Sequence, residues 1–346
     1  MALASITPDT IKGSNAERSR SSNRQAVLGH IHTAGRMGRA ELARALGLST
    51  QAVSNIIADL EREGLLIETG VRSAGRGLPA IQYAVNPGGG YAMGIEIRPD
   101  ALFTALVDLQ GAVAAKGRQP LAAHTPDIVV EAVRMLRAKM LAQTGIAESR
   151  LLGAGIVMPG PFGQTGLSGL GLALTGWQKV NAARLFEEAL QMPVELSNDA
   201  NAAAMAERIG GTAQGVSHFA YLYFGAGLGL GLISRGQLVA GAFGNAGEIG
   251  HIPIPTAEGP QPLETLVSRA SVQRALAARG PLDIAALDAL YSEGAEDLMG
   301  WLSQACTSLG QAVALIENLF DPQTIILGGA MPRAVLDHMV AHTPRP

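Results

Sequence analysis

The segment Glu41-Leu-Ala-Arg-Ala-Leu-Gly-Leu-Ser-Thr50 decides the fold of the amino-terminal part of this 346-residue chain. Its small residues Ala43 and Ala45 allow two helices to cross closely. Gly47 supplies the turn between them, and Ser49 is a favoured N-cap for the helix that follows. The segment therefore predicts a helix-turn-helix.

The residues on either side extend this unit to a winged helix-turn-helix over residues 23–86. Residues 1–22 are polar, and we expect them to form a flexible arm. A glycine-rich stretch around Gly75-Arg76-Gly77 predicts a wing between two strands. Apolar periodicity predicts helices over residues 23–34, 39–46 and 50–63, a break at 35–38, and strands over 65–67 and 81–85.

Polar side chains near the start of the third predicted helix are the candidate DNA contacts. Recognition helices insert that end into the major groove, where hydroxyl and amide groups bond to base edges. Arginines on the wing reach phosphates or a narrow minor groove. The alternative is an ordinary helical domain with a solvated polar face, but the helix-turn-helix, the capping serine and the basic wing together favour operator DNA. The candidates are Thr50, Gln51, Ser54, Asn55, Arg72 and Arg76.

The charged residues are distributed unevenly between the two parts of the chain. Residues 1–85 contain ten Lys/Arg and seven Asp/Glu, whereas residues 86–346 contain sixteen and twenty-two. A basic module on an acidic body fits phosphate contact at the amino-terminal end. The single cysteine, Cys306, excludes a disulfide within the chain. No apolar run is long enough to span a bilayer and no secretory segment is present, so we expect a cytoplasmic protein without a membrane partner.

After Pro87-Gly-Gly-Gly90 the pattern changes to an α/β domain over residues 91–346. The 43 glycines and 47% hydrophobic residues suit a large, tightly turned core. We expect strands over residues 91–97, 102–109, 151–157, 194–197, 219–224, 228–233 and 324–327, and helices over 128–144, 182–190, 200–209, 302–319 and 335–340.

Two groups of polar residues in this domain suit a sugar. Asn198 and Asp199 stand where a strand passes into a helix, which places Asp199 at the positive end of the helix dipole. Glu248 and His251 are three residues apart after two glycines, so both can face one ligand. Carboxylates and amides pair with vicinal hydroxyls. The alternatives are a plain helix cap for Asp199 and a buried histidine with its bonds satisfied for His251.

Five segments follow one another in a distinctive order: Gly153-Ala-Gly-Ile-Val-Met-Pro-Gly-Pro161, Ser197-Asn-Asp-Ala-Asn-Ala-Ala-Ala204, Gly225-Ala-Gly-Leu-Gly-Leu-Gly231, Gly244-Asn-Ala-Gly-Glu-Ile-Gly-His251 and Leu319-Phe-Asp-Pro-Gln-Thr-Ile-Ile-Leu-Gly-Gly329. Together they resemble the ROK family (repressors, open reading frames and kinases), and the winged helix matches its repressor branch. The resemblance implies a two-lobed, actin-like ATPase domain of the sugar-kinase type. It also implies sugar contacts by Asn198, Asp199, Glu248, His251 and Glu264.

The resemblance fails at the first phosphate loop. The family has Asp-x-Gly-Gly-Thr between its first two strands, whereas this chain has Glu96-Ile-Arg-Pro-Asp100. Arg98 adds bulk, Pro99 removes a backbone donor, and Asp100 places a negative charge where phosphate would bind. We therefore expect no kinase activity and no cofactor, with Asp199 remaining at the position of the kinase general base.

Two further departures follow the histidine. Many family members have a cysteine-rich zinc loop there, but here no cysteine follows His251, and Glu264 takes the place of the loop's last glutamate. A structural zinc site needs about four ligands, so we expect no metal. The stretch after Gly329 is shorter than in the family, which implies an incomplete adenosine side.

These observations predict a sugar-responsive regulator of carbohydrate-metabolism genes that acts as a repressor. A sugar or phosphosugar would close the lobes and alter the spacing of two winged helices, which implies a homodimer or homotetramer. One alternative is an ATP-dependent sugar kinase with an accessory DNA-binding domain. Another is a domain that binds no sugar and only oligomerises.

Overall fold

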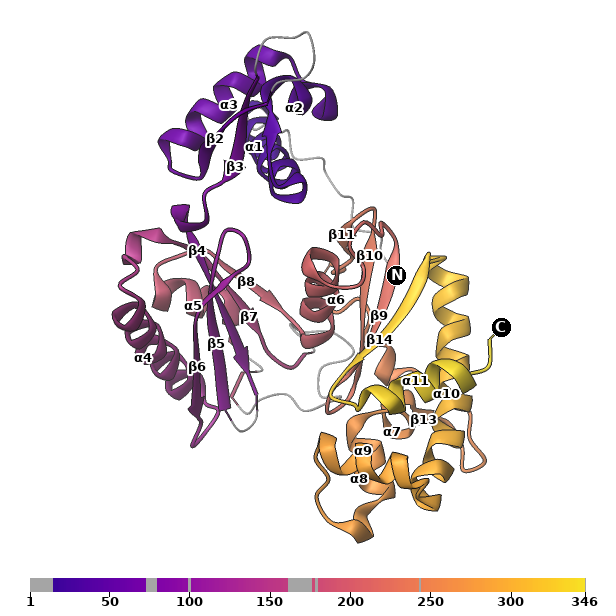
Figure 1. The fold of residues 1–346 in the computed structure, drawn as a ribbon. Coiled ribbons are helices and arrows are strands. Elements are labelled where there is room, and N and C mark those ends of the chain that lie inside the picture. Colours follow the sequence, from indigo (N-terminus) through magenta and orange to yellow (C-terminus); the bar gives the residue numbers. More distant parts are fainter. Residues whose placement is uncertain are drawn as a thin grey trace, which may run out of the picture. The chain divides into compact units, whose positions relative to one another are not determined.

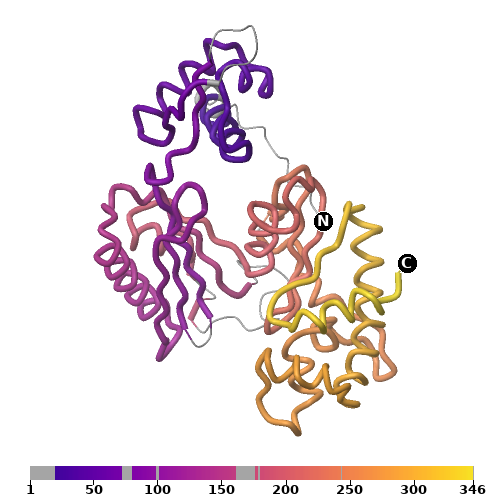
Figure 2. The backbone as a smooth tube through the Cα atoms, in the orientation of Figure 1, coloured from indigo at the N-terminus to yellow at the C-terminus, as the bar shows by residue number. Residues whose placement is uncertain are grey.

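The computed structural model describes residues 15–72, 80–98, 101–160, 176–177, 180–242 and 244–345. The chain forms two compact units (Figures 1 and 2). The first unit contains residues 1–94, 104–118 and 135–154, and the second contains residues 95–103, 119–134 and 155–346.

The first unit begins with a winged helix. Its elements are α1 (Asn15–Ala34), β1 (Met37–Gly38), α2 (Arg39–Leu46), α3 (Thr50–Arg62), β2 (Leu66–Arg72) and β3 (Ala80–Val85). The antiparallel sheet has the order β1-β3-β2, and the three helices pack beside it (Figure 1). Val27, Leu42, Ile57, Leu60 and Tyr83 are fully buried at the centre of its core. The predicted helix-turn-helix and the strands on either side of the wing are therefore present.

The predicted arm over residues 1–22 is wrong for residues 15–22, because α1 already begins at Asn15. Residues 1–14 lie outside the described residues. Ion pairs connect α1 to α3, from Arg20 to Asp59 at 2.6 Å and from Arg24 to Glu63 at 2.5 Å. The early turns of α1 are held by charge rather than by an apolar stripe, so hydrophobic periodicity does not reveal them.

The predicted break at residues 35–38 contains the short strand β1. Gly38 pairs with Gln82 of β3. A Cβ at Gly38 would lie 2.8 Å from the Gln82 amide nitrogen, so a larger residue here would have to displace the Gln82 side chain. Gly38 also donates its backbone N–H to Glu41 at 2.8 Å, which caps the start of α2.

Two larger sheets form the α/β region. The first has the order β6-β5-β4-β7-β8, and the second has the order β11-β10-β9-β14. The first sheet and its helices comprise β4 (Tyr91–Ile97), β5 (Ala101–Asp108), β6 (Val113–Pro120), α4 (Pro126–Thr144), β7 (Leu151–Val157), α5 (Ala182–Leu190) and β8 (Val194–Ser197). β7, α5 and β8 have the predicted bounds, and the prediction missed β6, which has no apolar alternation.

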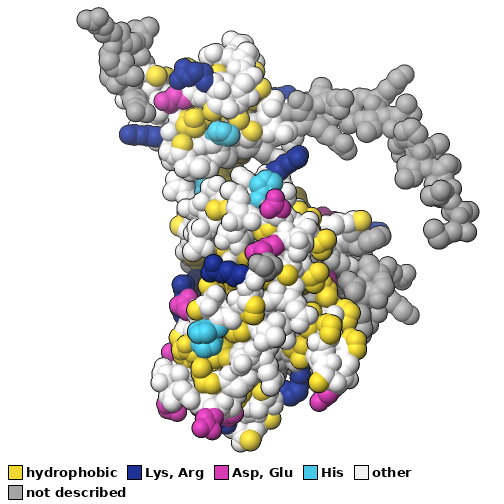
Figure 3. All heavy atoms as spheres, turned by 90° about the vertical axis from the view of Figure 1, so that its right-hand side faces the viewer, with side chains coloured by type: hydrophobic (Ala, Val, Ile, Leu, Met, Phe, Trp, Pro, Cys, Tyr) yellow, Lys and Arg dark blue, Asp and Glu magenta, His cyan; other side chains and the backbone are white. Residues whose placement is uncertain are grey.

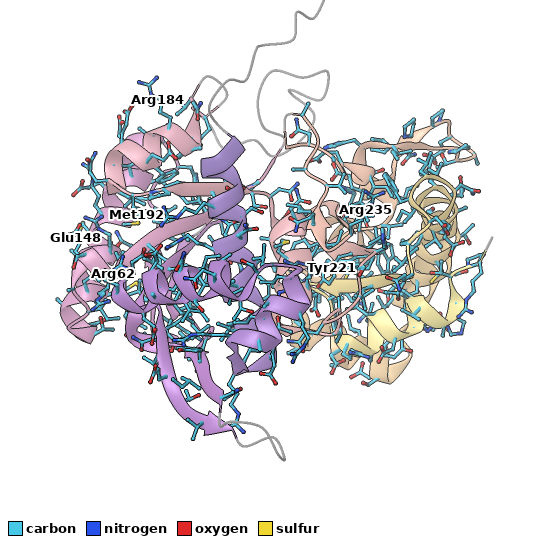
Figure 4. The ribbon with its side chains drawn as sticks, turned by 90° about the horizontal axis from the view of Figure 1, so that it is seen from above. Arg62, Glu148, Arg184, Met192, Tyr221 and Arg235 are labelled. Carbon is cyan, nitrogen blue, oxygen red and sulfur yellow. The ribbon has the colours of Figure 1, made fainter. Side chains whose placement is uncertain are left out.

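The second sheet lies entirely in the second unit. Its strands are β9 (Phe219–Phe224), β10 (Leu228–Ser234), β11 (Gln237–Leu238) and β14 (Thr324–Gly329). Helix α6 (Asp199–Gly210) packs against β10, where Cβ atoms at Gly229 and Gly231 would meet Ala200 and Ala204. The Tyr221 side chain of β9 lies beside Gly328 of the neighbouring strand β14. Figure 4 labels Tyr221 in this sheet. Small residues thus bring α6 close to this sheet.

Helices after residue 260 form the other face of the second unit. They are α7 (Leu263–Leu266), α8 (Arg269–Ala275), α9 (Ile284–Glu293), α10 (Glu296–Phe320) and α11 (Arg333–His342). The prediction missed α7, α8 and α9. It started α10 six residues late and gave α11 only residues 335–340, whereas buried Val335, Leu336 and Met339 anchor a longer helix.

Candidate functional site

The amino-terminal half of α3 presents the predicted DNA-binding side chains. Ser49 caps the helix by accepting a hydrogen bond from the Ala52 backbone N–H at 3.2 Å. Burial of Val53, Ile56, Ile57 and Leu60 on the opposite face fixes which side of the helix meets solvent. Thr50, Gln51 and Asn55 are exposed and Ser54 is half-buried.

Two of these side chains are already arranged as a pair. The Gln51 amide donates to Asn55 Oδ1 at 3.0 Å, across one turn of α3. Two adjacent amides on an exposed helix face present donors and acceptors of the kind that base edges match. Arg72 ends β2, but its side chain lies outside the described residues, as does Arg76. The predicted wing contacts therefore stay predictions.

The far end of α3 is joined to the α/β region within the first unit. A hollow of about 530 Å³ is lined by Glu63, Leu65, Gly89, Ser149, Arg150 and Leu152. Arg150 donates from Nη1 to the Gly89 carbonyl at 3.1 Å, and Asn86 donates to the Gly64 carbonyl at 2.7 Å. A Cβ at Gly89 would collide with the Gly64 carbonyl. We call these six lining residues the junction, because they join the end of the recognition helix to the start of β7.

The five predicted sugar-binding residues lie together in the second unit, and we call them the polar cluster. Asn198 is the N-cap of α6, where its Oδ1 accepts from the Asn201 N–H at 2.8 Å. Its amide also donates to Glu248. The Met158 N–H donates to the Ser197 carbonyl at 3.2 Å and so ties the end of β7 to β8. The strand ends thereby place Asn198 and Asp199 beside the loop that contains Gly160.

His251 connects the two glutamates of the polar cluster. Its Nε2 lies 3.6 Å from Glu248 Oε2, and its Nδ1 lies 3.8 Å from Glu264 Oε1. The short helix at Ile249–His251 turns Glu248 and His251 to one side, and α7 brings Glu264 to the other. Both separations exceed ordinary hydrogen-bond lengths.

Glycines make the space in which these carboxylates sit. A Cβ at Gly160 would lie 3.1 Å from Glu248 Oε1, and one at Gly225 would lie 3.1 Å from Asp199 Oδ2. A Cβ at Gly227 would collide with the Glu264 carboxylate. The sequence indicated glycine-rich loops but not which carboxylates they accommodate.

Burial shapes the electrostatics of the polar cluster. It raises the pKa of Asp199, the Ala200 backbone N–H lowers it, and the charge of Glu96 raises it further. Burial also raises the pKa of Glu248, which His251 and the Asn198 hydrogen bond partly offset. Both acids therefore ionise less readily than exposed ones.

The strand end before the altered phosphate loop holds an ion pair. Arg98 donates to both oxygens of Glu96, at 2.6 and 2.9 Å, and its guanidinium lies 4.6 Å from the centre of the Phe103 ring. Neither the ion pair nor the stacking on Phe103 was predicted from the sequence. Pro99 and Asp100 lie outside the described residues.

Two negative findings apply only to the residues that the structure describes. No group of three or more His, Cys, Asp or Glu side chains is placed to hold a metal ion in that part of the chain. Within the same residues, no helix is long and apolar enough to cross a membrane.

Comparison with known proteins assigns both parts of the chain. A model described as the ROK family matches residues 92–344, and one described as the MarR family matches residues 26–77. The xylose repressor of Bacillus subtilis (strain 168) is 25% identical over 325 residues, which cover 88% of this chain and 81% of that protein. The DNA-binding transcriptional dual regulator NagC of Escherichia coli (strain K12) is 25% identical over 338 residues, covering 90% and 81%.

Solved structures match different shares of the chain. A ROK family transcriptional regulator, a homologue of the E. coli MLC protein, has a TM-score of 0.76 at 24% identity and covers 94% of this chain and 89% of that chain. The ROK hexokinase from Thermus thermophilus has a TM-score of 0.59 at 26% identity and covers 73% and 87%. The regulator therefore matches along the winged helix as well, whereas the kinase matches a smaller share of the chain.

A winged helix joined to a sugar-kinase-like domain defines a DNA-binding transcriptional regulator with an effector domain. The chain belongs to the ROK family. The predicted family, the α/β fold class with its two parts, and the class of function are confirmed. The roles of individual residues in binding sugar and DNA stay predictions.

Proposed function

We propose that this protein is a sugar-responsive repressor of carbohydrate-metabolism genes, in which the polar cluster binds the sugar and α3 reads the operator. The observation that carries the proposal is the presence of both sites in one chain. An exposed amide pair lies on a capped recognition helix, and five polar residues from separate segments meet in the effector domain. The similarity to the xylose repressor of Bacillus subtilis supports repression rather than activation.

The polar cluster suits a polyhydroxylated ligand. Asn198 holds the α6 N-terminus and contacts Glu248, so it fixes the orientation of one carboxylate. Asp199 and Glu264 accept from hydroxyl groups, and His251 accepts or donates according to its tautomer. A merely structural cluster would satisfy these groups among themselves, but the 3.6 and 3.8 Å separations around His251 are too long for that.

We propose that the protein is not a kinase, although its fold is that of one. The Glu96–Arg98 ion pair fills the end of β4, where a phosphate loop would need backbone N–H groups free to approach phosphate. The sequence of Pro99 and Asp100 argues the same way. The alternative is a sugar kinase with an accessory DNA-binding domain, since Asp199 still occupies the position of a general base. Titration calorimetry with ATP and Mg²⁺ decides between them, because a kinase binds nucleotide.

The signal reaches DNA through the first unit. Elements β4, β5, β6, α4 and β7 each begin in one unit and end in the other, so the chain itself connects the polar cluster to the junction. Sugar binding changes DNA affinity to the extent that the sugar binds two states of the protein differently.

We propose a cytoplasmic homodimer or homotetramer, because one winged helix supplies few specific contacts. Figure 3 shows hydrophobic side chains at the surface of the second unit near α10 and α11. The exposed ones on these helices are Leu315, Leu319, Phe320 and Val340. Sedimentation equilibrium of the wild type and of a Leu319→Glu, Phe320→Glu double variant tests this part of the proposal.

The deciding experiment is a thermal-shift titration with a panel of sugars and phosphosugars, with and without ATP. We expect one sugar to raise the Tm of the wild type, and ATP to change nothing. Asp199→Ala should abolish that response. Glu195→Ala, which removes an exposed carboxylate from β8, is the matched control and should respond normally. No response to any sugar contradicts the proposal, and turnover of sugar with ATP restores the kinase alternative.

A further inference from the structure

Helix α11 carries two histidines one helical turn apart. Of the seven histidines in the chain, only His338 and His342 stand four residues from one another. At that spacing two side chains lie on one face of a helix. Their rings stack, with centroids 4.0 Å apart and planes inclined by 20°. His342 is exposed and His338 is half-buried, so the pair borders solvent.

The hydrogen bonds of the two rings use their Nδ1 atoms. His342 Nδ1 lies 2.8 Å from the His338 carbonyl oxygen. Because a carbonyl only accepts, Nδ1 carries the proton and His342 Nε2 keeps a lone pair. His338 Nδ1 lies 3.2 Å from the Tyr291 hydroxyl of α9, which can accept a proton in the same way. Within the described part of the chain, no hydrogen bond or ion pair engages Nε2 of either ring.

The surroundings of His338 favour the neutral ring that metal ligation requires. Burial lowers the pKa of His338, and the charge of His342 lowers it further. The Tyr291 ring meets His338 edge-on, with centroids 5.6 Å apart. A hydrogen bond to one imidazole nitrogen fixes the tautomer and the direction of the other nitrogen, as it does for histidines that bind metals.

The separation of the two rings suits a single ion. Imidazole nitrogens bind Zn²⁺ at about 2.0–2.1 Å, so two nitrogens on one ion lie at most about 4.2 Å apart. The ring separation of 4.0 Å is within this limit. Helix α11 ends at His342, where the negative end of the helix dipole favours a cation.

We propose that His338 and His342 form a binding site for a divalent transition-metal ion, with Nε2 of each ring as ligand and Tyr291 positioning His338. Imidazole ligands favour Zn²⁺, Ni²⁺ and Cu²⁺, whereas Mg²⁺ and Ca²⁺ prefer oxygen. The described residues place no third His, Cys, Asp or Glu with the pair, so water completes the coordination. The ion crosslinks the last turn of α11, whose buried Val335 and Met339 pack in the second unit. Bound metal therefore stabilises this unit.

Titration calorimetry of the metal-stripped wild-type protein with ZnCl₂ tests the site. We expect one ion per chain, and no binding of Mg²⁺. His342→Ala should weaken Zn²⁺ binding by at least about tenfold, and Tyr291→Phe, which removes only the hydroxyl, by a smaller factor. His30→Ala is the matched control and should bind as the wild type does. His30 is exposed on α1, and its Nδ1 lies 3.1 Å from the carbonyl four residues before it, but it has no histidine partner.

A measurement on the wild type alone covers the case in which a variant does not fold. Zn²⁺ should protect His338 and His342 from diethyl pyrocarbonate, as mapped by mass spectrometry, and should leave His30 reactive. Equal reactivity of the pair with and without Zn²⁺ overturns the proposal, as does unchanged Zn²⁺ affinity in a folded His342→Ala variant. Loss of Zn²⁺ binding in His251→Ala but not in His342→Ala also overturns it, because the ion would then lie in the polar cluster.

Discussion

The recognition helix and the polar cluster differ in how the chain builds them. The proposed DNA-binding face comes from one helix of thirteen residues, whose cap, buried stripe and exposed face all lie within residues 49–62. The polar cluster draws on the end of β8, the turn before Ile249–His251, and α7, and three glycines make room for its carboxylates. A site formed by one helix should keep its geometry when residues elsewhere in the chain are substituted. A site formed by several segments depends on the packing of each of those segments.

The largest expected effect tests the dependence of the composite site on its glycines. Gly247 has φ +92° and a Cβ there would strike the Leu230 carbonyl. Gly247→Ala should therefore destabilise the second unit by about 3 kcal/mol or more and abolish sugar binding. Gly294→Ala is the matched control, because Gly294 has φ +68° and ψ +35°, in the left-handed helical region, with nothing near its Cβ position, and should cost only about 1–2 kcal/mol. Urea unfolding measures both, and equal costs contradict the steric explanation.

The next effect concerns the local site. Gln51→Ala and Asn55→Ala should each weaken operator binding by roughly 10- to 100-fold, because a good pair of bonds to a base is worth about 1–3 kcal/mol. Their sugar affinity should equal that of the wild type. Fluorescence anisotropy on an operator selected from random DNA measures the change. Thr33→Ala, on α1, is the control, and loss of sugar binding in either α3 variant would show that the two sites are not independent.

A smaller effect is expected at the junction. Arg150→Ala removes the hydrogen bond to Gly89, so the end of α3 is held less firmly to the α/β region. Sugar affinity should stay the same, while the sugar-induced change in DNA affinity should shrink several-fold, or about 1 kcal/mol of coupling. Lys139→Ala removes an exposed cation from the same unit and should leave the coupling intact. If sugar changes the DNA affinity of Arg150→Ala as much as that of the wild type, the junction does not transmit the effect of sugar binding.

The smallest effect is a pH dependence of stability. The pKa values of Asp199 and Glu248 are raised in the folded protein, so the folded state binds more protons than the unfolded state above their ordinary values of 3.8 and 4.5. Stability should therefore rise as pH falls from 7 through the raised pKa values. When the pH is lowered from 7 to 5, the Tm of the Asp199→Asn, Glu248→Gln double variant should rise less than the Tm of the wild type. The same change of Tm with pH in both proteins would show that other groups cause the pH dependence of stability.

The sequence predicts the local site almost completely. The cap at Ser49 and the buried stripe from Val53 to Leu60 follow from residue type and spacing, and the structure places both as expected. Prediction from the sequence fails in the early turns of α1. These turns are held to α3 by ion pairs of Arg20 and Arg24 with residues far along the chain, and not by an apolar stripe. The wing contacts of Arg72 and Arg76 are not tested.

For the composite site, the sequence predicts the members but not their arrangement. The family motifs single out all five residues of the polar cluster, and the structure brings them together. Nothing in the sequence shows that His251 lies between Glu248 and Glu264, or that Gly227 accommodates a carboxylate, because these contacts join segments far apart in the chain. The helices α7 and α8 were missed because they have only four and seven residues, so a pattern of 3.6 residues has too few turns in which to appear. Helix α9 has ten residues but buries only Leu287, so no apolar stripe marks it in the sequence.

The most direct test of the central claim measures operator binding while a sugar that binds the protein is titrated in. The same titration is run on Asp199→Ala and on the Glu195→Ala control. We expect the sugar to release DNA from the wild type and the control at the concentration that saturates the polar cluster, and to leave the Asp199→Ala complex bound. Unchanged DNA affinity in the wild type at saturating sugar would contradict the coupling of the two sites.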